Sequence, residues 1–149
     1  MAGWVCRTIE ILDMSTTSDT TNVFSMGING AKPRDFEYAN AFKEPYGIRI
    51  SGEYAELEQQ VKGIEFRLRG EIEKTQYRLE APDIGDLVVI DAGLVNTHYS
   101  PRTVKLEITW ADHSTRQIVA EYEIYAKDDR PEGTGTSITL KGHIDIHYK

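Results

Sequence analysis

The last third of the chain alternates apolar and polar residues with a period of two, and this pattern constrains the fold more than any other feature. It runs through residues 103–110, 116–125 and 138–148. Successive side chains of a β-strand point to opposite faces, so the pattern indicates strands with one face in a core and one in solvent. We therefore expect an antiparallel meander of three strands, in which Trp110 continues the apolar face of the first strand.

Earlier segments predict further strands with less regular alternation. The dipeptide Asn29-Gly30 often marks a hairpin, but the next four residues do not alternate and include Pro33. We expect a turn into a long loop there, because proline disfavours the interior of a strand. The strands predicted before the meander cover residues 4–12, 22–28, 46–51, 64–73, 76–80 and 87–91.

The segment between residues 53 and 73 changes its apolar period at Gly63. The apolar residues before this glycine follow the three- and four-residue spacing of an amphipathic helix, whereas residues 64–73 alternate. We therefore predict a short helix from Glu53 to Lys62, followed by a strand. In that strand Phe66 should be buried together with its alternating apolar neighbours.

These elements together predict a single, mainly β domain over residues 1–149. We expect an antiparallel β-sandwich or jelly roll of seven to nine strands with one short helix, and a partly open β-barrel is the alternative. A chain of this length, with 40% apolar residues, can bury a sizeable core without a disulfide or metal.

The chain is acidic, with 24 aspartates and glutamates against 17 lysines and arginines and a net charge of −7. Both signs are spread along the sequence, so no basic patch indicates an electrostatic grip on nucleic acid. An acidic surface also repels anionic membranes. We expect neither nucleic acid nor a membrane as a partner.

Cysteine use and apolar runs bear on the compartment. Cys6 is the only cysteine, so the chain has no internal disulfide, and the apolar alternation around it favours a buried, inert thiol. The first residues lack the basic start and long apolar run of a signal peptide, and the longest apolar run, residues 87–90, is too short to cross a bilayer. We expect a cytoplasmic protein, or one assembled into a particle inside the cell.

Two loops carry the residues that we predict for a binding site. His98 and Tyr99 come just before the first strand of the meander, and Asp128, Asp129 and Arg130 come between its second and third strands. In a meander these two loops lie at the same end of the sheet. Loops at one end of a sandwich often carry the specificity of binding modules, so we expect the five residues to share one rim.

The sequence contains no evident catalytic or cofactor-binding motif. Residues 132–137 contain two glycines but precede a strand rather than a helix, which predicts a hairpin loop and not a phosphate cradle. Asp112, His113 and Ser114 are consecutive, and neighbours in one loop cannot form a relay whose members converge from separate segments. We expect no catalytic residue and no cofactor.

His143, Asp145 and His147 are the set most similar to a metal site. On an extended strand they share one face, but the two histidines lie roughly 13–14 Å apart, which is too far for a single ion. We therefore predict a charge-paired outer face without a metal, on which His143 lies beside Glu121.

The register of the meander follows from the need to match its apolar faces. The simplest pairing sets Trp110 opposite Arg116 and Ile118 opposite Ile146. On the outer face this pairing aligns Lys105 with Glu121 and His143, Glu123 with Lys141, and Gln117 with His147.

The leading functional hypothesis is a non-catalytic binding or assembly module. Such a module would recognise a protein partner, itself in an oligomer, or a glycan, as a structural subunit of a viral, phage-tail or similar assembly does. The alternative is a small metal- or acid/base-dependent enzyme that uses His98, His113 and the strand with His143, Asp145 and His147. A carrier of an apolar ligand is a third hypothesis.

Overall fold

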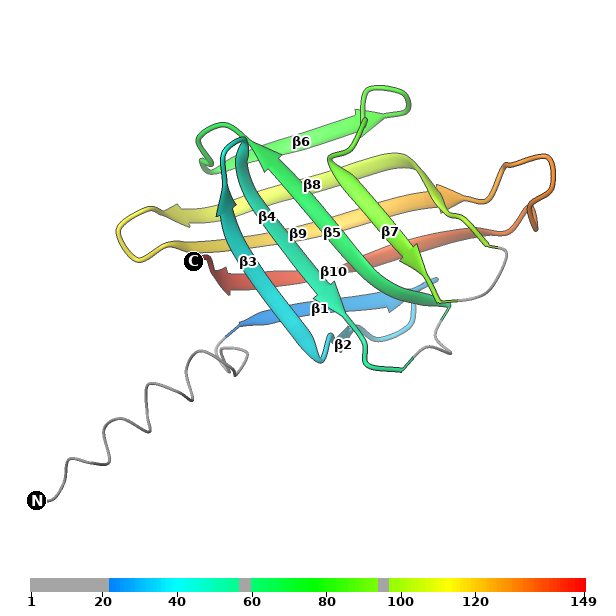
Figure 1. Ribbon diagram of the computed structural model, residues 1–149, viewed down its shortest axis with the longest axis horizontal. Helices are drawn as coiled ribbons and strands as arrows, with labels where there is room; N and C mark the ends of the chain where they lie inside the picture. Colours follow the sequence, from blue (N-terminus) through cyan, green and yellow to red (C-terminus); the bar gives the residue numbers. More distant parts are fainter. Residues whose placement is uncertain (1–21, 57–59, 94–96) are drawn as a thin grey trace, which may run out of the picture.

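The computed structural model describes residues 22–56, 60–93 and 97–149. The strand predicted at residues 4–12, with Cys6, lies outside these residues. The described residues form ten strands and no helix (Figure 1): β1 (Val23–Ile28), β2 (Arg34–Asp35), β3 (Tyr38–Glu44), β4 (Gly47–Glu53), β5 (Val61–Arg69), β6 (Thr75–Glu80), β7 (Val88–Ala92), β8 (Ser100–Asp112), β9 (Gln117–Lys127) and β10 (Ser137–His147).

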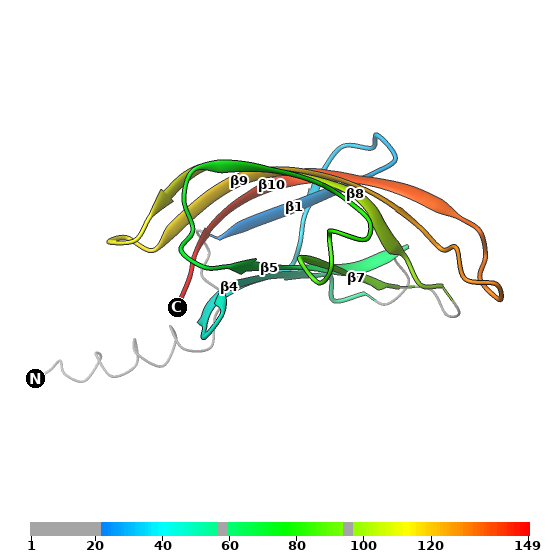
Figure 2. The ribbon, with the colours of Figure 1, turned by 90° about the horizontal axis from the view of Figure 1, so that it is seen from above.

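The strands form two antiparallel sheets that face each other, and the prediction of a mainly β fold is confirmed. One sheet has six strands in the order β2-β1-β10-β9-β8-β6, and the other has four in the order β3-β4-β5-β7. The six-stranded sheet arches over the four-stranded sheet (Figure 2). The arrangement is sandwich-like and is not closed into a barrel.

The core fills the space between the two sheets with apolar side chains from both. Phe24 of β1, Phe66 of β5 and Tyr122 of β9 meet at its centre, with ring centroids 5.3–6.1 Å apart. The predicted burial of Phe66 is confirmed, as is that of its neighbours Ile64 and Leu68. Successive residues of β5 point to opposite faces of its sheet, and these three point toward the other sheet.

The predicted meander of β8, β9 and β10 is confirmed, and so is half of its register. Between β9 and β10, Glu121 pairs with His143, as predicted, and both side chains are exposed. Between β8 and β9 the prediction is wrong by two residues, because Lys105 pairs with Glu123 rather than with Glu121. The other β9–β10 pairs also follow the prediction: Ile118 with Ile146, Glu123 with Lys141, and Gln117 with His147.

Trp110 does not continue the apolar face of β8, and that prediction is wrong. The pairing of β8 with β9 shifts between Ile108 and Trp110, so Trp110 pairs with Val119 on the outer face. Such a β-bulge adds a residue to one strand and reverses the facing of the residues beyond it. Trp110 is therefore 52% exposed.

The helix predicted from Glu53 to Lys62 is also wrong for the residues that the structure describes. Glu53 ends β4, and Lys62 lies in β5. Tyr54 donates its backbone N–H to the carbonyl of Lys62 at 2.8 Å, so the segment is a connection between two antiparallel strands. Tyr54 and Val61 are both buried, and their spacing imitated that of a helix.

The loop that follows the turn at Asn29-Gly30 is shorter than predicted. It leads to the short strand β2, which pairs with β1, and then to β3, which the sequence did not indicate. The strand predicted at residues 64–73 ends at Arg69, although Ile72 beyond it is buried.

Candidate functional site

Asp128 organises the connection between β9 and β10. Its side chain is fully buried, and its carboxylate accepts hydrogen bonds from Arg130 Nε at 2.9 Å and from the backbone N–H groups of Thr134 at 3.1 Å and His98 at 3.3 Å. A side chain at Gly133 would place its Cβ 2.2 Å from Asp128 Oδ1, so the carboxylate occupies the space that this glycine leaves. The Arg130 guanidinium, with these N–H donors, holds the pKa of Asp128 well below its usual range.

Hydrogen bonds and an ion pair link three of the five predicted site residues, Asp128, Arg130 and His98, and the other two make contacts elsewhere. Asp128 and Arg130 tie the loop to the backbone of His98. Asp129 is exposed and pairs with Arg102 at 2.9 Å. Tyr99 is 2% exposed, and its hydroxyl accepts a hydrogen bond from Gln60. The His98 side chain is exposed and the Tyr99 ring is buried, so His98 is the one of the two aromatic residues whose ring a ligand could contact.

β7 is an end strand of the four-stranded sheet and pairs only with β5 among the described residues. The N–H of Arg67 bonds to the carbonyl of Leu87, which makes these two residues a hydrogen-bonded pair. In an antiparallel ladder such pairs alternate, so Val89 directs its backbone groups toward β5. Val88 and Ile90 therefore direct their N–H and C=O groups away from the sheet.

A groove of about 340 Å³ borders β7, where this strand lies beside the start of β8 (Figure 1). It is lined by Val88, Val89 and Ile90, by residues 98–101, and by the connection between β6 and β7. The Asp128 anchor thus fixes the backbone of one wall of this groove, at His98. The sequence identified β7 as a strand from its apolar residues but gave no signal that it lies at an edge.

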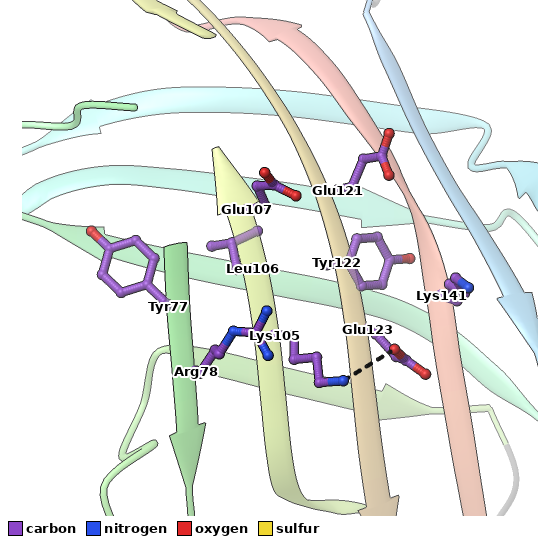
Figure 3. Close-up of a pocket in the computed structure, with 9 residues that line it drawn as sticks. All are labelled: Tyr77, Arg78, Lys105, Leu106, Glu107, Glu121, Tyr122, Glu123 and Lys141. Atoms are coloured by element: carbon purple, nitrogen blue, oxygen red, sulfur yellow. Dashed lines mark ion pairs between the residues drawn. The ribbon is translucent and has the colours of Figure 1, made fainter. Parts of the chain in front are cut away.

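The outer face of the six-stranded sheet carries charged side chains of both signs around a shallow hollow of about 150 Å³ (Figure 3). Lys105 lies 4.0 Å from Glu123, and Glu121 lies 4.0 Å from His143. Glu107 and Glu121 face each other directly across β8 and β9. Opposite charges across neighbouring strands suit a solvated sheet face, and such pairs contribute little each.

Three of the four histidines of the alternative enzyme hypothesis line separate hollows. His98 lines the β7 groove, His143 lies beside the turn after β1, and His113 lies in a cleft at the far end of β8, where its Nδ1 is 3.1 Å from the Tyr148 hydroxyl. Asp145 accepts a hydrogen bond from Gln117. Within the described residues, no group of three or more His, Cys, Asp or Glu side chains is arranged to hold a metal ion.

Comparison of the chain with protein-family models, with curated proteins and with solved structures found no match. Over the part of the chain that the structure describes, no helix has the length and apolar content needed to cross a membrane.

Proposed function

We propose that the chain is a non-catalytic binding and assembly module that takes up an extended protein strand at the edge of β7. The observation that carries the proposal is the outward direction of the backbone groups of Val88 and Ile90 into an apolar groove. A strand edge whose backbone groups are not bonded within its own sheet can pair with another chain through backbone hydrogen bonds. Val88 and Ile90 are 2% and 6% exposed, so an incoming strand would displace residues that line the groove beside them.

The walls of the groove support a strand rather than a compact ligand. The side chains of Val88 and Ile90 belong to the core, whereas Val89 on the other face is 40% exposed. An added strand would extend both faces of the sheet, and its alternate side chains would contact the core side and the outer side in turn. His98, held through its backbone by Asp128, would flank that strand.

The other sheet edges carry features that discourage such pairing. β1 is covered in part by β2, which pairs with it at Ser25 and Met26. β3 exchanges backbone hydrogen bonds with Lys149, whose N–H and carbonyl bond to Ala41 and Lys43. On β6, Arg78 and Glu80 are exposed and charged, and charges on an edge strand disfavour pairing.

Selection from a random peptide library displayed on phage tests this proposal without knowledge of the natural partner. Selected peptides should alternate apolar and polar residues and should shift the amide resonances of Val88 and Ile90. Ser100→Phe, which fills the groove, should abolish their binding, whereas Thr115→Phe in the exposed turn at the far end of β8 should not. Peptides that shift other amides and bind Ser100→Phe normally would contradict the proposal.

Several finer expectations belong with this proposal. We class the fold as an antiparallel β-sandwich rather than a jelly roll, because β3–β4–β5 and β8–β9–β10 are simple meanders. A protein partner or a second copy inside a cell fits the acidic surface, and nucleic acid and anionic membranes fit it poorly. The enzyme and apolar-carrier hypotheses keep the status of alternatives, and the dispersed histidines and filled core offer them little support. A glycan, which the leading hypothesis also allowed, has no peptide backbone to pair with β7.

A further inference from the structure

We propose that the strand taken up by β7 is residues 4–12 of a second copy of this chain. The inference rests on the proposed strand uptake and adds the identity of the partner. Residues 4–12 are rich in β-branched and aromatic residues, and the stretch Thr8-Ile9-Glu10-Ile11 alternates polar and apolar side chains. These are the properties that pairing with an apolar strand edge requires.

The direction of the backbone groups of β7 fixes a register for an antiparallel pair. Val88 and Ile90 offer their N–H and C=O groups, so the two residues opposite them form hydrogen-bonded pairs. If Ile9 lies opposite Ile90 and Ile11 opposite Val88, all four side chains lie on the core side of the sheet. The two pairs then exchange four backbone hydrogen bonds.

The same register gives the outer face a compatible composition. Thr8 lies opposite the exposed Asp91, to whose carboxylate its hydroxyl can donate. Glu10 lies opposite Val89 and avoids a direct contact with Asp91. Shifting the pairing by one residue would turn both isoleucines outward, so the pattern of the segment selects this parity.

The place where the described chain begins favours a second copy over the same molecule. The Asn22 side chain bonds to the carbonyl of Ala39 in β3 and to the N–H of His147. β3 and β7 are the two end strands of the four-stranded sheet. Three strand spacings, about 14 Å, separate β3 from β7, and residues 13–21 would have to cross them to bring residues 4–12 to β7 of the same molecule, whereas a second copy can approach β7 directly.

A disulfide between positions 10 and 89 tests this register in the full chain. These two residues form a non-hydrogen-bonded pair, whose Cα atoms lie about 4.5 Å apart, within the range of a disulfide. With Cys6→Ser in the background, Glu10→Cys with Val89→Cys should give covalent dimers and higher multimers on oxidation. The matched control is Glu10→Cys with Tyr38→Cys, because Tyr38 is 52% exposed on β3, against 40% for Val89, and should give no efficient link.

The double variant Ile9→Asp/Ile11→Asp tests the contact by its affinity. Light scattering over a concentration series should show association of the wild type and a loss of about tenfold or more for each isoleucine, the factor expected when a buried aliphatic side chain is replaced. Thr8→Ser/Glu10→Gln, which changes the outer positions, should associate as the wild type does.

Each outcome decides between the two levels of the proposal. A monomeric wild type, an intramolecular 10–89 disulfide, equal linking in the Tyr38 control, or unchanged association of Ile9→Asp/Ile11→Asp would overturn the inference about the partner. If library peptides still bind at Val88 and Ile90 in that case, strand uptake by β7 stands. If they bind elsewhere, the proposed function fails as well.

Discussion

Replacing Tyr122 by phenylalanine should destabilise the protein by removing one buried hydrogen bond. The pairing of β1 with β10 runs through Phe24 and Ile144 and resumes at Gly27 and Lys141, which leaves a gap in the ladder. In this gap the Tyr122 hydroxyl donates to the carbonyl of Ser25 at 2.6 Å.

Gly142 makes this contact possible. A Cβ built on it would lie 1.9 Å from the Ser25 oxygen and 2.8 Å from the Tyr122 hydroxyl. The Tyr122 hydroxyl therefore reaches the Ser25 carbonyl through the space that a side chain at position 142 would fill. Burial raises the pKa of Tyr122 well above its usual value, so the hydroxyl keeps its proton and donates at neutral pH.

The magnitude follows from what Tyr122→Phe leaves behind. The ring and its contacts with Phe24 and Phe66 stay, but the buried Ser25 carbonyl loses its donor. Leaving a buried acceptor unsatisfied costs about 1–3 kcal/mol. For a chain of this size that corresponds to a fall in Tm of roughly 2–4 °C per kcal/mol.

Urea denaturation at pH 7, followed by circular dichroism, measures this loss. The matched control is Tyr125→Phe on the same strand, because Tyr125 is 40% exposed and faces outward, and it should change the free energy of unfolding by less than about 0.5 kcal/mol. Equal stability of Tyr122→Phe and the control would refute the reasoning. Because the folded-state pKa is raised, the contribution of Tyr122 is present below about pH 10, the usual tyrosine value, and is lost as the pH rises further.

Three further predictions concern other parts of the molecule. Asp128→Asn should speed amide exchange at Thr134 relative to wild type above about pH 4, the usual aspartate pKa. Since the folded-state pKa of Asp128 is depressed, this difference should vanish only as the pH falls well below that usual value. Equally slow exchange at Thr134 in the variant and in wild type at neutral pH would argue against the anchor. Trp110→Ser should lower the free energy of unfolding by less than about 1 kcal/mol in urea, whereas a loss of roughly 3–5 kcal/mol would place Trp110 in the core. Phe66→Asp buries an unpaired carboxylate and should cost more than about 4 kcal/mol, so a cooperative thermal transition close to that of wild type would contradict the central position of Phe66.

The sequence predicted the long strands well because their inward and outward residues differ clearly. β9 and β10 alternate throughout, so their faces and their mutual register could be derived from parity and a short list of charges. β3 was missed because its inward residues, Ala39 and Ala41, are small, while Tyr38 and Phe42 are aromatic residues on its other face. The two faces of β3 therefore differ little in apolar character, and the sequence shows no clear alternation there.

The errors arose where one residue changes the geometry of all those beyond it. The bulge between Ile108 and Trp110 reverses the end of β8, and nothing in Thr109 or its neighbours indicates it. The turn before Gln117 is tighter than predicted, so Trp110 pairs with Val119 rather than with Arg116, three residues away, and beyond the bulge the difference is two residues. Tyr54 and Val61 imitated a helix because two antiparallel strands bring them to the same core.

The sequence indicated one wall of the candidate site but not the strand edge beside it. The meander correctly indicated that the loop at His98 and the loop at Asp128 lie at one end. The burial of Asp128 depends on the fold of its own loop around Gly133 and Thr134, and the open edge of β7 depends on the strand order. Neither of these long-range relations leaves a periodic trace in one chain.

Amide hydrogen exchange at Val88 and Ile90, measured across a series of protein concentrations, tests strand uptake by β7 most directly. At low concentration both amides, which point away from the sheet, should exchange faster than the amide of Val89, which is bonded toward β5. As the chain associates, the exchange of Val88 and Ile90 should slow in step with the mass measured by light scattering. Slow exchange of both amides in the monomer, or rapid exchange in the assembled state, would contradict the account.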